Sequence, residues 1–177
     1  MSLQIKKLLT GLASIAGKAF LAAQEVTIEM NPESLSKEKL ISAQENGVTR
    51  LSLGVQSLNE NALAAVGRHC KSKDTFTSID LIKSLWKGSL SLDVIAGLPS
   101  QHAGDFLKSL KQIIDFNGEH ISLYTLIIEE KTPLCRLINQ NKIAWDYDEA
   151  DRQWILGRDL LEESGYEQYE VSNFSKK

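Results

Sequence analysis

Short apolar runs alternate with helix-like patterns along most of this chain, and that alternation constrains the fold more than any other feature of the sequence. Apolar stretches typical of strands begin near residues 25, 50, 89, 120 and 168, and a helical pattern lies between each pair. Strands that alternate with helices favour β/α units, which form a parallel sheet covered by helices. The sequence therefore predicts an α/β fold: a (β/α) barrel or part of one, or an open doubly wound sheet.

Caps and turn residues mark the ends of the expected elements. Ser72 is placed to cap the start of one helix, and Gly47 and Gly67 are placed to end two others. Strands are expected at 25–31, 50–57, 89–99 and 120–129, and helices at 36–46, 59–67, 72–88 and 105–116. A short helix after Pro133, a longer one ending before Gly165 and a last strand-like segment, YEQYEVSNF, complete the chain.

Length, charge and cysteine content exclude several classes of protein. The chain has 177 residues, 42% of them hydrophobic, and a net charge of -3, which suits one domain and offers no basic surface for nucleic acid. Its first 24 residues are apolar at helical spacing but interrupted by lysines, so we expect an amphipathic helix rather than a signal peptide or membrane span. Cys70 and Cys135 lie far apart, which predicts reduced thiols in a cytoplasmic protein and no metal site.

Three successive predicted strands each carry one polar side chain near the carboxyl end: Glu29, Gln56 and Asp93. Ligands of parallel β/α folds bind at that end of the strands, so these groups mark a candidate ligand edge; capping of nearby loops is the alternative. Arg68 follows a glycine that ends a helix, so its guanidinium can return to the same edge and meet a ligand carboxylate. A surface salt bridge is the alternative for Arg68. The set is chemically matched to an amino acid joined to a nucleoside.

Five segments, in this order and at these spacings, resemble the core of a known family. They are EVTIEMNPESL, RLSLGVQSLNENALAAVGR, SLDVIAGLPSQ, HISLYTLIIEEKTPL and YEQYEVSNF. From about residue 25 to 174 the chain resembles the radical S-adenosylmethionine (SAM) proteins of the oxygen-independent coproporphyrinogen III oxidase group. The IEEKTPL and YEQYEVSNF segments resemble the heme chaperone branch of that group more closely than the oxidase itself.

The resemblance implies a partial (β/α) barrel, with parallel strands and helices outside, that binds SAM and a [4Fe-4S] cluster. The family's SAM-contacting positions correspond here to Glu29, Gln56, Arg68, Asp93 and, more loosely, Ile127. By this resemblance Arg68 holds the methionine carboxylate, and the acidic and amide groups hold the ammonium and ribose. In the intact oxidase, SAM cleavage gives a 5′-deoxyadenosyl radical that abstracts hydrogen from a propionate side chain, which leads to decarboxylation to a vinyl group. The implied small-molecule ligand is a porphyrin or heme.

Two segments typical of the family are missing from this chain. It has neither a Cys-x3-Cys-x2-Cys motif nor a GGGTPS-like glycine-rich segment, and its two cysteines match neither. We therefore expect residues 1–177 to be the central portion of the barrel, without the N-terminal strands that carry the cluster motif and without the C-terminal domain. Either it is a piece of a longer protein with MSL as a cloning leader, or a degenerate gene product. Alone, it is expected to be inactive and to associate through the open edge of its first strand.

Three functions stay open from the sequence: a radical SAM oxidoreductase of porphyrin synthesis, a heme chaperone on the same scaffold, and an unrelated β/α-barrel enzyme or binding protein. His69 and His120 are candidate heme or proton-handling groups, with surface or capping roles as the plainer interpretation. Trp145 and Trp154 are candidates for stacking on a porphyrin, with packing as the plainer interpretation.

Overall fold

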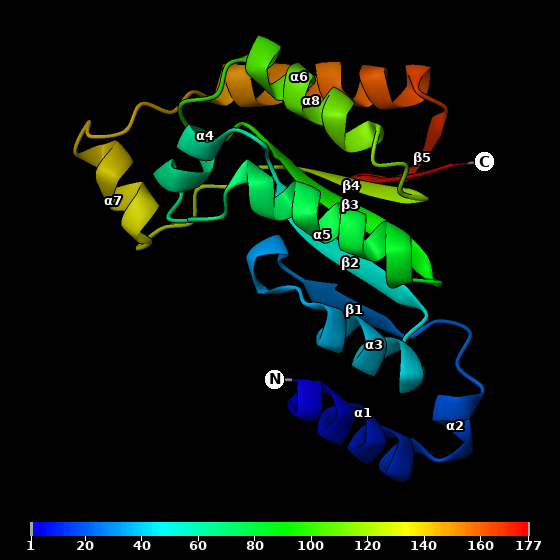
Figure 1. The fold of residues 1–177 in the computed structure, drawn as a ribbon. Coiled ribbons are helices and arrows are strands. Elements are labelled where there is room, and N and C mark those ends of the chain that lie inside the picture. The colour runs from blue at the N-terminus through cyan, green and yellow to red at the C-terminus, as the bar shows by residue number, and fades with distance from the viewer. Residues whose placement is uncertain (1, 177) are drawn as a thin grey trace.

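The computed structural model of the chain describes residues 2–176 and contains one mixed sheet flanked by helices (Figure 1). Its strands are β1 (Thr27–Met30), β2 (Arg50–Gln56), β3 (Ser89–Ala96), β4 (His120–Thr125), β5 (Tyr166–Glu170) and β6 (Asn173–Lys176). Its helices are α1 (Ser2–Ala16), α2 (Lys18–Leu21), the 3-10 turn η1 (Pro32–Ser34), α3 (Lys37–Glu45), α4 (Glu60–Ala65), α5 (Ser72–Leu85), α6 (Ala103–Ile114), α7 (Pro133–Asn139) and α8 (Tyr147–Glu163). The predicted strands and helices are confirmed, with ends that differ by a few residues.

The sheet has the order β1-β2-β3-β4-β6-β5. The first four strands are parallel and are joined by helical crossovers, as the alternation predicted. The last segment differs from the prediction of a fifth parallel strand, since it forms a hairpin whose strand β6 runs antiparallel to β4. Only two residues, 171 and 172, separate β5 from β6, and a parallel crossover needs a much longer connection.

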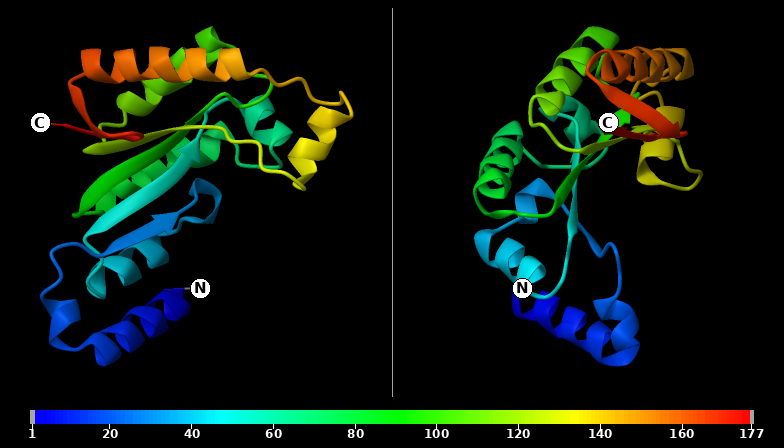
Figure 2. Two further views of the ribbon diagram at one scale, coloured as in Figure 1. Left: turned by 180° about the vertical axis from the view of Figure 1, so that it is seen from behind. Right: turned by 90° about the vertical axis from the view of Figure 1, so that its right-hand side faces the viewer.

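Side chains alternate between the two faces along most of the sheet, apart from an irregularity near the end of β2. The helix-covered face carries a buried apolar core that includes Leu51, Leu53, Leu92, Ile121 and Leu123, all 0% exposed. Residues between them in sequence are small or polar, and they form the opposite face, which no helix covers along β2 and β3 (Figure 2). Figure 2 shows α3, α5, α6 and α8 on the outer side of this curved sheet, so the polar face is the concave inner surface of a partial barrel.

The N-terminal segment forms the expected helix, α1, which packs on α3. Leu9 is buried in that contact, whereas Leu8, Leu12 and Ile15 on the same helix stay exposed. Strand β1 lies at one end of the sheet and has β2 as its one strand neighbour, so the predicted open edge is present. Within residues 2–176, no helix has both the length and the apolar character needed to span a bilayer.

Candidate functional site

A row of polar residues crosses the inner face of the sheet from β1 to β4. Glu29 is in register with Ser52, and Asp93 is in register with Ser122. The hydroxyl of Ser52 lies 3.0 Å from each carboxylate oxygen of Asp93 and so can donate to either. All four residues line one cavity of about 570 Å³ that opens on the inner face. The structure thus brings together the two carboxylates predicted from separate strands.

Burial raises the pKa of Asp93, and the nearby negative charge of Glu29 adds to the increase. The hydroxyls of Ser52 and Ser122 and the positive charge of Arg50 oppose it. Arg158–Asp159 is the ion pair found among residues 2–176, so no cation pairs directly with Asp93 there. Asp93 is therefore a half-buried carboxyl held by neutral donors, with capacity left for a ligand hydroxyl or ammonium.

Gln56 ends β2 in an unusual backbone conformation. Its φ is 64°, and the Ser57 N–H donates to the Val55 carbonyl at 2.8 Å, which makes a γ-turn centred on Gln56. A positive φ at the centre of a γ-turn is the rarer and more strained of the two γ-turn forms. The ladder between β2 and β3 is irregular here, and Gln56 lies beside Val94, one residue beyond Asp93. The predicted glutamine therefore lies at the same edge as the predicted carboxylate.

Gly54 leaves space that two side-chain amides, those of Gln56 and Asn31, occupy. A Cβ atom at Gly54 would lie 2.9 Å from the Gln56 Nε2 and 3.0 Å from the Asn31 Oδ1. The first contact is too short for a real Cβ and the second is unusually tight, so glycine at this position lets both amides lie close to the strand. Asn31 follows β1 and was not among the residues selected from the sequence; the short IEMNP motif, which continues the alternation after Glu29, was the available signal.

Arg68 returns to the carboxyl edge as predicted. Gly67 has φ 76° and ends the turn after α4. The Arg68 N–H caps this helix end by donating to the Leu63 carbonyl at 2.9 Å. The Arg68 guanidinium donates to the Gly54 carbonyl at 3.3 Å and is half-buried. The remaining donors of the guanidinium have no ion-pair partner among residues 2–176. Arg68 and Gln56 therefore converge on the same glycine, which brings these two predicted residues together.

Ile127 does not join this cluster. It lies beyond β4 with 71% of its surface exposed. The neighbouring Leu126 continues the sheet by donating its N–H to the Ala96 carbonyl at 2.9 Å, so the backbone of this segment reaches the carboxyl edge although the Ile127 side chain makes no packing contact there.

His120, a candidate heme or proton-handling residue, lies on the inner face. His120 Nδ1 is hydrogen-bonded to the Ser91 hydroxyl at 2.8 Å, and His120 Nε2 is hydrogen-bonded to the Tyr169 hydroxyl at 2.8 Å. Burial, followed by the charge of Arg50, lowers the pKa of His120, which favours the neutral ring. The indole N–H groups of Trp145 and Trp154 donate to the backbone carbonyls of Gly97 and Leu123. Trp154 packs against the apolar core, whereas Trp145 lines a cavity of about 400 Å³.

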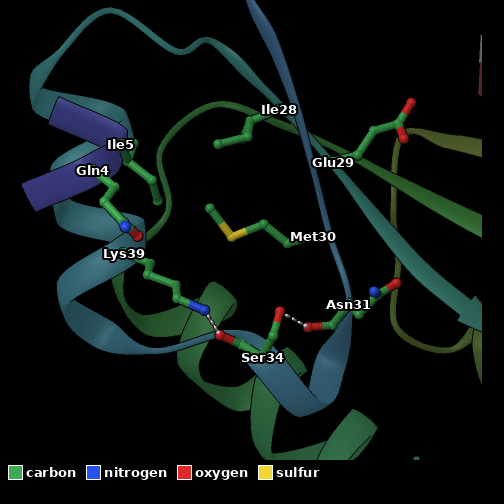
Figure 3. Close-up of a pocket in the computed structure, with 8 residues that line it drawn as sticks. All are labelled: Gln4, Ile5, Ile28, Glu29, Met30, Asn31, Ser34 and Lys39. Carbon is green, nitrogen blue, oxygen red and sulfur yellow. Dashed lines mark hydrogen bonds between the residues drawn. The ribbon is translucent and has the colours of Figure 1, made fainter. Parts of the chain in front are cut away.

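A second cavity, of about 420 Å³, lies on the other side of β1 (Figure 3). In Figure 3, Ile28 and Met30 point toward α1 and α3, whereas Glu29 and Asn31 point away from them. The lining is mixed: Ile5, Ile28 and Met30 are apolar, and the polar residues are Gln4, Glu29, Asn31, Ser34 and Lys39. This cavity lies toward the helix-packing side of β1, and Glu29 lines both it and the cavity over the polar row.

The residues present do not suit an iron–sulfur cluster. Cys70 is buried and Cys135 is half-buried, both are free thiols, and the sequence holds no third cysteine. Among residues 2–176 no three His, Cys, Asp or Glu side chains gather as a metal site. That this chain offers no metal ligands stays a prediction from its sequence.

Asp93 lies in the middle of β3 rather than near its carboxyl end, where the sequence predicted it, and Gln56 ends β2. A half-open (β/α) barrel with an amide and a guanidinium at the carboxyl end of a parallel strand and carboxylates on its inner face is typical of barrel proteins that bind a cofactor toward that edge. Residues 3–113 match the Radical SAM superfamily profile, and the chain belongs to this family.

Curated relatives agree with the family assignment over nearly the whole chain. The mitochondrial radical S-adenosyl methionine domain-containing protein 1 of Bos taurus is 37% identical over 93% of this chain and 38% of its own length. Heme chaperone HemW of Bacillus subtilis is 34% identical over 98% of this chain and 46% of its own length. The chain thus spans less than half the length of these relatives.

Solved structures show the same fold. Coproporphyrinogen III oxidase (HemN) from Escherichia coli superposes with a TM-score of 0.82 over 99% of this chain and 40% of that protein, at 22% identity. The archaeal Elp3 of Methanocaldococcus infernus superposes with a TM-score of 0.69 over 86% of this chain and 39% of that protein, at 23% identity. The predicted partial barrel of the radical SAM type is confirmed.

Proposed function

We propose that this chain supplies the SAM-binding edge of a radical SAM protein of heme or porphyrin metabolism. The observation that carries this proposal is the convergence of Gln56 and Arg68 on Gly54, which lies two residues beyond Ser52 of the row that also holds Glu29 and Asp93. These groups lie at the end of the barrel where ligands of this fold bind. Family membership supports SAM as the ligand.

Each group has a chemically matched part of SAM to bind. The free donors of Arg68 suit the methionine carboxylate, which accepts two parallel hydrogen bonds from a guanidinium. Asp93 and Glu29 accept from the ribose hydroxyls or the ammonium, and the Gln56 amide can donate or accept. SAM beside a reduced [4Fe-4S] cluster supplies radical chemistry in this family. The residues of this chain do not fit that cluster, so their part is to bind and orient SAM.

A binding measurement on this chain tests the proposal. Isothermal titration with SAM should give saturable binding, and Arg68→Ala should weaken it by roughly tenfold or more, because a hydrogen bond to a charged group contributes about 1.5–3 kcal/mol. Arg152→Ala, on the exposed side of α8, is the control and should leave the affinity unchanged. Equal affinities for both variants would contradict the assignment of Arg68.

A heme chaperone is the finer function we favour over an oxidase. HemW proteins, which are named heme chaperones, match 86% to 98% of this chain at 32% to 34% identity. The resemblance of the IEEKTPL and YEQYEVSNF segments to that branch supports the same choice. A porphyrin or heme is accordingly the proposed second ligand.

The chain within its full reading frame, reconstituted anaerobically, separates the two functions. For a chaperone, heme titration should give stoichiometric binding, and incubation with SAM, reductant and coproporphyrinogen III should give no protoporphyrinogen. Turnover of coproporphyrinogen III would reverse the choice in favour of the oxidase. A cytoplasmic location stays a prediction from the free thiols, because one group of relatives is named mitochondrial.

A further inference from the structure

The γ-turn at Gln56 needs an anchor, because its backbone conformation is disfavoured. A residue other than glycine at positive φ costs about 1–2 kcal/mol and persists only where the surrounding structure enforces it. The 2.8 Å hydrogen bond from the Ser57 N–H closes the turn but does not by itself exclude the extended alternative. The neighbouring side chains should therefore hold Ser57 in place.

Ser57 is fixed from both sides within the core. It is 1% exposed, and its hydroxyl accepts from the Asn59 N–H at 3.0 Å. The same hydroxyl donates to the Oε1 of Gln101 at 3.2 Å. Gln101 is 4% exposed and belongs to the loop after β3, so this bond ties the turn after β2 to the next loop along the carboxyl edge.

Gln101 is in turn held by α8. The Nε2 of Gln153, which is 0% exposed, donates to the Gln101 backbone carbonyl at 2.6 Å. The Oε1 of Gln153 accepts from the Gly97 N–H at 2.9 Å. The one buried amide is therefore hydrogen-bonded to both ends of the loop 97–101. A continuous chain of hydrogen bonds thus runs from α8 through Gln101 to Ser57 and the turn.

The side-chain amide of Gln101 lowers the stability of the folded chain, because one of its polar atoms is buried without a partner among residues 2–176. Its Nε2 is buried and has no hydrogen-bond partner among the residues that the structure describes. An unpaired buried donor costs about 1–3 kcal/mol, so a residue selected only for core stability would be apolar here. The amide provides Oε1, which accepts the hydrogen bond from the Ser57 hydroxyl.

We propose that Gln101 and Ser57 are positioning residues that hold Gln56 at positive φ and so aim its amide at the SAM edge. The inference rests on the proposed SAM site, and it assigns to the SLDVIAGLPSQ segment a role beyond that of Asp93. Gln101 acts through Gln56 and does not itself contact the ligand.

The backbone part of the proposal is tested without any ligand. In Gln101→Met the anchor is lost together with the unpaired donor, so the free energy of unfolding should stay equal to that of the wild-type chain or rise. The amide–Hα coupling and Cβ chemical shift of Gln56, read by NMR, should move toward extended values. Ser57→Ala cuts the same bond from the other side and should give the same shift. Gln112→Met, on the exposed side of α6, is the control and should change neither signal.

A double-mutant cycle tests whether Gln101 acts through Gln56. Gln101→Met should weaken SAM binding by about fivefold in the wild-type background, the worth of one hydrogen bond. In the Gln56→Ala background the same substitution should have no further effect. An equal loss in both backgrounds, or a Gln56 signal that keeps its positive-φ values in Gln101→Met and Ser57→Ala, would overturn the proposal. Absence of SAM binding by the wild-type chain would reject the proposed function, while the NMR result would still decide whether Gln101 anchors the turn.

Discussion

At the scale of single residues, the carboxyl edge of this sheet holds side chains in conformations and environments that reduce stability. Gln56 occupies a positive φ, and Asp93 is a half-buried carboxyl without a cation partner among residues 2–176. Such features tend to gather where proteins bind ligands, because the surrounding structure keeps them ready for contact. Two predictions separate their stability cost from their binding role.

Gln56→Gly should stabilise the chain and weaken SAM binding. Glycine adopts φ 64° without strain, so the free energy of unfolding should rise by about 1 kcal/mol in urea denaturation. Loss of the amide should weaken SAM binding by roughly tenfold. Lys131→Gly is the matched control, because Lys131 also has a positive φ, of 66°, on an exposed loop: it should stabilise the chain similarly and leave the affinity unchanged. A destabilised Gln56→Gly would refute the strain argument.

Asp93→Asn should change how stability depends on pH. Since burial raises the pKa of Asp93, the folded chain binds this proton more tightly than the unfolded chain. Stability is therefore highest below the unfolded pKa and falls as the pH rises through the folded pKa. Asparagine removes that loss, so the variant should exceed the wild type in free energy of unfolding at pH 7, and the two should converge below about pH 3.9.

The same substitution should weaken SAM binding by roughly tenfold, because it removes a charged acceptor. Asp80→Asn, exposed on α5, is the control for both measurements. An Asp93→Asn variant that is less stable than the wild type at pH 7 would contradict the role of burial.

At the scale of elements, the β5–β6 hairpin completes the sheet on the side of β4. Tyr166, at the start of β5, is 3% exposed, and its hydroxyl donates to the Gly118 carbonyl at 2.6 Å. Helix α8 reaches the sheet closely at Gly97, where a Cβ would lie 2.3 Å from the Cβ of Ala150. These contacts fix where the last helix and the hairpin lie, and α8 carries Gln153, the base of the buried amide chain.

Tyr166→Phe should cost about 1 kcal/mol of stability at neutral pH, because it removes a buried hydrogen bond and leaves the Gly118 carbonyl unpaired. Burial raises the pKa of Tyr166 to about 12. In the wild type, stability should thus fall as the pH rises from about 10, the ordinary value for tyrosine, through the folded value. Denaturation across this pH range should show that fall, less steep in Tyr166→Phe. Tyr147 is 64% exposed, so Tyr147→Phe is the control and should behave as the wild type. An unchanged slope in Tyr166→Phe would show that this tyrosine does not titrate with unfolding.

At the scale of the whole molecule, the chain is a partial barrel whose sheet ends at β1 and β5 and whose inner face is polar. Strand β1 ends the sheet, and an edge strand offers unpaired backbone groups to another chain. On the inner face, Glu29 and Asp93 line an open cavity of about 570 Å³. Association through β1 is therefore a proposal that follows from the architecture.

Sedimentation at micromolar concentration should show dimers or higher oligomers. Thr27→Lys places a charge on β1, which should disfavour edge-to-edge pairing and shift the chain toward monomer. Thr77→Lys makes the same change on the exposed side of α5 and should leave the oligomers intact. A monomeric wild-type chain would rule out association through this edge.

The sequence by itself determined the kinds of elements, their order and most of the candidate edge. Periodicity is a local property, so the four parallel strands and their helices could be predicted, as could the return of Arg68 after Gly67. The carboxyl-end rule then selected Glu29, Gln56 and Asp93 without knowledge of their neighbours. Their function as SAM ligands stays a proposal.

Only the tertiary structure decided which groups meet. The antiparallel pairing of β6 with β4, the approach of Asn31 and Gln56 to Gly54 and the amide chain from Gln153 to Ser57 all join residues distant in sequence. No local pattern encodes such contacts, because they depend on strand register and on the docking of α8. The strain at Gln56 was hidden for the same reason: a backbone angle that the residue alone disfavours is enforced by the packing around it.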